Sequence, residues 1–216
     1  MSFKSKNGFI ACVITFFCFL LIAIAFSTPC WLETDGELKD ATFIRIGLWQ
    51  VCFQNFEEPH HWYDTKLTGC WWVFEEEYYI IHDFLLPPFF VATQTFFTFC
   101  LTFLLFSLML LFKYMVSSKG SPRLPKLLFI LSALTGLSAL CGSIACIIFG
   151  ARGDGRDWMP NWEHNNISWS YALAVIGTLL LWVTTAQFFA EGRVLHFKLR
   201  AERQQRGAYS MDPVKH

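Results

Sequence analysis

Charged residues and histidine are absent from four long stretches of this 216-residue chain. The stretches cover residues 9–28, 89–112, 127–150 and 170–190. Each can cross a hydrocarbon core, which takes about 20 residues of helix. A helix of this length in a soluble protein would carry charges along its exposed face. The absence of ionisable side chains also argues against an intramembrane proton relay or ion path. We therefore predict a membrane α-helical protein, with four transmembrane helices in a bundle.

The sequence also lacks the motifs of the common enzyme classes. It has no glycine-rich phosphate loop, no nucleophile motif and no convincing metal-ligand spacing. His60, His61 and His82 share a segment with many carboxylates, but solvated loop histidines explain them better than a zinc site does. We expect no enzymatic activity, no cofactor, no metal and no nucleic-acid partner.

A formal net charge of zero hides an uneven distribution of charge. Segments 1–8, 113–126 and 191–216 hold twelve basic and three acidic residues, a net charge of +9. Segment 29–88 carries −8 and segment 151–169 carries −1. Basic residues next to spans favour the cytoplasmic side. The prediction is a plasma-membrane protein with both termini and a basic tail inside, and with 29–88 and 151–169 outside.

The N-terminus has a second interpretation, because two lysines, an apolar run and small residues also occur in cleavable signal peptides. The apolar stretch is longer than the usual 7–15 residues of a signal peptide. We therefore expect the first span to be retained.

Two cysteines, Cys52 and Cys70, lie well outside the predicted spans. An oxidising exterior favours a disulfide between them over two free thiols. Residues 49–54 and 70–74 alternate in character with a period of two, which predicts two strands. Antiparallel pairing would let the disulfide cross between them. Ile44 and Ile46 suggest a further strand just upstream.

The same outer segment contains an ordered series of six residues: Trp31, Gly47, Leu48, Trp49, Cys52 and Cys70. In a four-span chain with both termini inside, this series resembles the signature of the claudin and peripheral myelin protein superfamily. A belt of interfacial tryptophans would explain Trp31 but not the series. The 17 residues between the cysteines exceed the spacing expected of vertebrate claudins. The divergence is compatible with a septate-junction type of invertebrates, such as the Pasiflora proteins.

The resemblance implies a claudin-like fold with a small antiparallel extracellular β-sheet, and a role in cell adhesion at lateral cell-cell junctions. Such a protein would contribute to septate- or tight-junction organisation and to the paracellular barrier of epithelia. Besides the lipid bilayer, its partners would be other junction proteins, as homo- or hetero-oligomers in cis and in trans. The motif residues would hold the outer domain in shape. The superfamily also leaves open an auxiliary subunit of an ion channel or receptor, or a myelin-like membrane-organising protein.

Small residues recur at helical spacing in the third span: Ser132, Gly136, Ala139, Ser143, Cys146 and Gly150. Such stripes let helices approach closely, and we expect packing inside the protein's own bundle rather than an intermolecular seam. Asn166 begins a glycosylation sequon, but its closeness to the fourth span predicts that it stays unmodified. Residues 193–206 are predicted to form a basic amphipathic helix along the inner leaflet.

Overall fold

The computed structural model of the chain describes residues 5–38, 40–57, 66–118, 121–155 and 158–209. His60 and His61, whose metal-binding role was discounted above, lie outside these ranges, as does most of the segment that joins the two disulfide-bearing strands.

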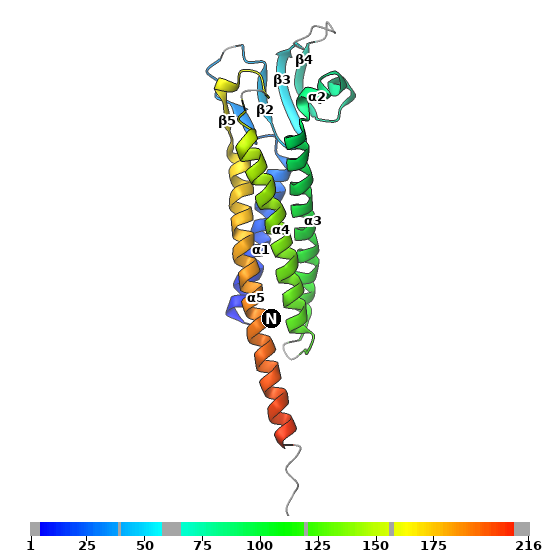
Figure 1. Cartoon of the computed structure of the whole chain (residues 1–216), viewed down its shortest axis with the longest axis vertical. Helices are drawn as coiled ribbons and strands as arrows, with labels where there is room; N and C mark the ends of the chain where they lie inside the picture. Colours follow the sequence, from blue (N-terminus) through cyan, green and yellow to red (C-terminus); the bar gives the residue numbers. More distant parts are fainter. Residues whose placement is uncertain (1–4, 39, 58–65, 119–120, 156–157, 210–216) are drawn as a thin grey trace, which may run out of the picture.

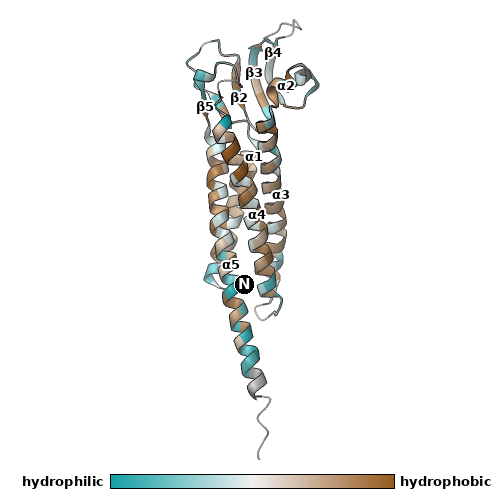
Figure 2. Cartoon of the chain, in the orientation of Figure 1, coloured by the Kyte–Doolittle hydropathy of each residue, from teal (hydrophilic) through white to brown (hydrophobic). Residues whose placement is uncertain are grey.

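Four long helices stand side by side in a bundle: α1 (Lys6–Ser27), α3 (Pro88–Val116), α4 (Leu124–Arg152) and α5 (Trp169–Tyr209) (Figure 1). Within the described residues, these four helices are long and apolar enough to cross a membrane. Helix α4 packs between α3 and α5, and α1 packs mainly against α5. Apolar residues dominate the shared length of the bundle (Figure 2). The predicted four-helix membrane bundle is confirmed.

The ends of the helices follow from local chemistry. The Ser5 side chain caps α1 by accepting a 2.9 Å hydrogen bond from the backbone N–H of Gly8. Pro88 occupies the first turn of α3, where a missing N–H costs nothing. Helix α5 continues to Tyr209, far beyond residue 190. The tail predicted to lie along the membrane surface is instead the continuation of α5, which projects from the bundle and becomes more hydrophilic (Figure 2).

A five-stranded antiparallel sheet lies at the other end of the bundle, in the order β4-β3-β2-β1-β5 (Figure 1). The strands are β1 (Leu32–Thr34), β2 (Phe43–Ile46), β3 (Gln50–Phe56), β4 (Leu67–Trp72) and β5 (Asn165–Ile167). The predicted small antiparallel sheet is confirmed. Strands β1 and β5 were not anticipated, and β5 comes from the segment between α4 and α5. Both long connections between helices therefore contribute to one sheet.

The described residues also form three short helical segments: η1 (Glu76–Ile81), α2 (His82–Leu85) and η2 (Trp162–His164). One hydrophobic core runs without interruption from the sheet into the bundle, and it includes Phe53, Tyr78 and Phe97, all fully buried. A second cluster, around Leu128 and Phe188, fills the opposite end. The sheet is thus packed onto the helices through side chains.

The small residues of α4 face α5 in the same chain. A Cβ added at Gly136 would lie 3.2 Å from Thr185 Cγ2, and one at Gly142 would lie 2.7 Å from Thr178 Oγ1. The Ser132 hydroxyl donates a 3.0 Å hydrogen bond to the Thr185 carbonyl. Larger side chains at Gly136 of the stripe and at Gly142 beside it would push the helices apart, so the small residues permit their close contact.

Candidate functional site

Trp31 joins the first helix to the sheet and is fully buried. Its ring packs edge-on against Phe97 of α3, Phe149 of α4 and Tyr171 of α5, with centroid distances of 5.1, 4.9 and 5.6 Å. Its indole N–H donates a 2.7 Å hydrogen bond to the carbonyl of Ala25 in α1. One side chain therefore contacts all four helices. Its complete burial rules out the alternative of a residue in an interfacial aromatic belt.

The turn between β2 and β3 lies directly on the chain that leaves α1. A Cβ added at Gly47 would clash with the Thr28 carbonyl oxygen and would lie 2.5 Å from Pro29 Cα, so this close approach requires glycine. Leu48 is fully buried, and its carbonyl accepts a 2.6 Å hydrogen bond from the side-chain amide of Gln94 in α3. The turn is thus fixed to α1 by close packing and to α3 by a buried hydrogen bond.

Trp49 extends this attachment toward the edge of the sheet. Its ring lies 5.2 Å from Phe26 at the end of α1 and 6.3 Å from Phe74. Its carbonyl accepts a 2.9 Å hydrogen bond from the backbone N–H of Val73. The Gly47-Leu48-Trp49 motif therefore orients the sheet relative to the bundle.

A disulfide joins Cys52 on β3 to Cys70 on β4, as predicted. The two residues are paired across the antiparallel ladder, with 4.0 Å between their Cα atoms. Cys52 is buried, whereas Cys70 is exposed. The bond therefore fastens the edge strand β4 to the buried strand β3.

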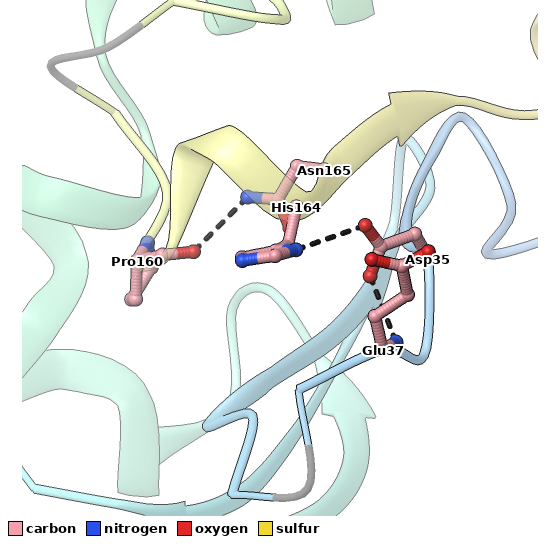
Figure 3. A network of polar contacts seen from close by, with 5 residues as sticks. All are labelled: Asp35, Glu37, Pro160, His164 and Asn165. Carbon is pink, nitrogen blue, oxygen red and sulfur yellow. Dashed lines mark hydrogen bonds and ion pairs between the residues drawn. The ribbon is translucent and has the colours of Figure 1, made fainter.

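A second attachment joins the two outer segments (Figure 3). His164 precedes β5, and Asp35 follows β1. The Nδ1 atom of His164 lies 2.9 Å from Oδ2 of Asp35. The backbone N–H of Asp35 donates a 2.7 Å hydrogen bond to the His164 carbonyl. The other Asp35 oxygen accepts a 3.0 Å hydrogen bond from the backbone N–H of Glu37. We call Asp35 and His164 the outer clamp, because they hold the two short strands in register.

Ligand atoms of Asp35, Glu37 and His164 lie within 4.8 Å of one another, a spacing that a divalent cation could use. All three residues lie at the surface, and the hydrogen bonds above already hold Asp35 against His164 and against the Glu37 backbone. We therefore assign these residues a structural role.

The contact between Asp35 and His164 predicts that the stability of the folded protein depends on pH. The hydrogen bond to Asp35 raises the pKa of His164, and hydrogen bonds from the Glu37 N–H and from His164 lower the pKa of Asp35. Glu37 and Glu163 also favour protonated His164. A raised histidine pKa stabilises the folded state fully below its ordinary value of about 6.5, and this contribution is lost as the pH rises through the folded-state pKa. The Asp35 contribution is instead lost as the pH falls through its lowered pKa.

The melting temperature of wild type relative to His164→Gln measures this effect. Wild type should melt at a higher temperature than the variant, and this difference should be largest near pH 5.5 and smaller at pH 8.5. All other groups are the same in the two proteins, so their contributions cancel in the difference. An advantage that does not change with pH would show that the clamp acts without the histidine charge.

A family model described as PMP-22/EMP/MP20/Claudin tight junction matches residues 16–189. The chain belongs to this family. The match includes the outer sheet and parts of all four long helices of this claudin-family protein. The recognition made from the ordered tryptophan, glycine and cysteine series is confirmed. No curated protein matches the chain. The family is a structural family of membrane proteins, in agreement with the expectation of a non-enzymatic role.

Four of the six claudin-family motif residues, Trp31, Gly47, Leu48 and Trp49, gather where the sheet meets the bundle, and the two cysteines join β3 to β4. Three further residues that hold the outer domain in place were not recognised from the sequence: Gln94 at this junction, and Asp35 and His164 in the outer clamp. Gln94 was visible as a lone amide in an apolar span, which is the signal that could have identified it. Asn166 lies exposed on β5, and the Ser168 hydroxyl of its sequon donates a 3.0 Å hydrogen bond to Glu33. Absence of glycosylation there stays a prediction.

Proposed function

We propose that this protein is a junctional adhesion protein that contributes to septate- or tight-junction organisation and to the paracellular barrier of an epithelium. In this proposal both termini are cytoplasmic and the sheet stands in the intercellular space. The charge asymmetry of +9 against −8 supports this orientation. The attachment of the sheet to all four helices supports a role in which the outer domain transmits contact between proteins.

The observation that carries the proposal is the open edge of the sheet at β4. Strand β4 ends the strand order, so one of its sides has no strand partner among the described residues. Three large apolar side chains lie exposed on or next to this strand: Trp71 at 41%, Trp72 at 56% and Phe74 at 54%. We call these three residues the edge patch. Exposed apolar patches and open strand edges are typical of protein interfaces.

An interface on the edge patch fits association with a neighbouring junction protein, or with a second copy, in the same membrane. Backbone groups along β4 would supply hydrogen bonds, and the tryptophans would supply buried apolar area. Contacts across the intercellular gap are part of the proposal, but they need a different surface because the two membranes face each other.

Localisation of a tagged copy in a polarised epithelium tests the proposal. Wild type should concentrate at lateral contacts, and its removal should raise the flux of a small tracer between cells. The double variant Trp71→Ala/Trp72→Ala should reach the surface but spread over it. Phe106→Ala, which removes a similarly exposed aromatic ring from α3, should behave as wild type. Uniform surface staining of wild type with unchanged tracer exclusion would refute the proposal, and co-purification with an ion channel would then favour an auxiliary subunit.

A further inference from the structure

A cavity of about 610 Å³ lies at the end of the bundle opposite the sheet, between the start of α4 and the projecting part of α5. Its polar lining consists of Lys126 from α4 and of His196, Arg200 and Arg203 from α5. The three α5 residues are spaced by four and three positions, which places them on one face of the helix. Three positively charged side chains, those of Lys126, Arg200 and Arg203, therefore line the same cavity.

The cavity exists because the two helices separate at a defined point. At Gly192 a Cβ would lie 3.3 Å from Leu128 Cβ and 3.3 Å from a ring carbon of Phe129, so α4 and α5 touch closely there. Beyond Gly192, α5 continues outward while α4 begins at Leu124 (Figure 1). The apolar part of the cavity lining includes half-buried Phe129 and Leu199.

No negative charge offsets these cations within the lining. The acidic residues of this end that the structure describes, Glu191 and Glu202, do not line the cavity. Glu191 Oε2 instead accepts a 3.4 Å hydrogen bond from the Asn7 amide. The start of α4 adds the partial positive charge of a helix N-terminus. The site is therefore suited to an anion with several charges and an apolar part.

The distance of the two arginines from the end of the apolar span limits which lipid headgroups can reach them. Arg200 and Arg203 lie seven and ten residues beyond Arg193, the first basic residue of α5, which is about 10 and 15 Å along a helix. The headgroup layer on one side of a bilayer is only about 5–8 Å deep. A lipid with a single phosphate would reach Lys126 but not the two arginines. A headgroup that carries further phosphates outward would reach all three.

We propose that this cavity binds the headgroup of a multiply phosphorylated inositol lipid of the cytoplasmic leaflet. Lys126, Arg200 and Arg203 bind the phosphates, and Phe129 contacts the apolar part next to the headgroup. Basic pockets between helices on the cytoplasmic side are a recurrent mode of binding for such lipids. The proposal rests on the inward placement of this end in the proposed function.

Binding of short-chain phosphatidylinositol bisphosphate to the purified full-length protein in a neutral detergent tests the site. Short-chain phosphatidylserine and soluble inositol trisphosphate serve as comparison ligands. We expect the bisphosphate lipid to bind most tightly. The variant Arg200→Gln/Arg203→Gln should bind it about thirtyfold more weakly, because two phosphate-binding cations are removed. Both positions are exposed on the projecting helix, so the melting temperature should not change.

The matched control is Arg193→Gln/Lys198→Gln, which removes the same charge from α5 outside the cavity. Arg193 lies over the rings of Phe189 and Phe197, at 6.0 and 5.4 Å. This control should change the affinity less than threefold. Equal weakening by the two variants would show attraction to a general basic surface and would overturn the site. Equal affinity for the lipid and the soluble headgroup would overturn the lipid assignment. Neither result would depend on where the protein localises in an epithelium, so the junction proposal is tested separately.

Discussion

Replacement of Trp31 by alanine should lower the free energy of unfolding by about 3–5 kcal/mol, the range for large aromatic residues removed from a core. Trp31 is fully buried and its ring packs against Phe97, Phe149 and Tyr171. The change would leave a cavity at the point where the sheet meets the helices. Pulse proteolysis of the purified protein in mild detergent measures the change.

The Trp31 N–H has its own role at the end of α1. The Ala25 carbonyl would ordinarily pair with the backbone N–H four residues later, but that residue is Pro29, which has none. The indole N–H of Trp31 satisfies this carbonyl at 2.7 Å, while the Ser170 hydroxyl lies at 3.4 Å. Trp31→Phe keeps most of the ring packing and loses this hydrogen bond, so its cost should be about 1 kcal/mol.

Trp72→Ala is the matched control, because it removes the same side chain from an exposed position at the other side of the sheet. Its effect on stability should stay within about 0.5 kcal/mol. The free energy of unfolding should fall most in Trp31→Ala, less in Trp31→Phe and least in Trp72→Ala. Equal costs for the two alanine variants would mean that Trp31 does not hold the sheet on the bundle.

The spans and the central strands could be predicted because their signals are local. An uncharged run of 20 residues has few alternatives to a membrane helix. The alternation over residues 49–54 places Val51 and Phe53 on one face, and both are buried in the structure. Strands β1 and β5 have three residues each and pair through their backbones, so their sequences carry no periodic signal. Their pairing depends on the packing of α1 beside α5, which the sequence alone does not reveal.

The path of α5 could not be predicted from amino-acid composition. The basic residues after position 190 predicted a helix correctly, but they did not determine its direction. No proline interrupts the chain between residues 170 and 209, and Gly192 packs against α4 instead of breaking the helix. The helix therefore continues along its axis. The cavity beside it arises from this continuation, which is why the sequence placed Arg200 and Arg203 on a helix along the membrane surface and not in a cavity with Lys126.

Loss of the Cys52–Cys70 disulfide should have the second largest effect, and it should be confined to the edge of the sheet. The bond closes a loop with a sequence separation of 18, which stabilises the folded hairpin by about 3 kcal/mol in the chain-entropy model. Strand β4 pairs with β3 alone among the described strands, so it is the strand most dependent on the bond. In Cys52→Ser/Cys70→Ser, amide hydrogens of the β3–β4 ladder should exchange about a hundredfold faster than in wild type. Those of the β1–β2 pair should change much less.

Cys141→Ser is the matched control, because Cys141 is a free cysteine in α4 and only half-buried. It should leave exchange in the sheet unchanged. A reductant that cannot cross membranes should reproduce the fast exchange in wild type and have no further effect on the double serine variant. Because the edge patch lies on and next to β4, the same treatment should also remove the protein from lateral contacts if the patch is the proposed interface. Slow exchange in the reduced wild type would instead show that packing of Phe53 and Tyr78 holds the hairpin without the bond.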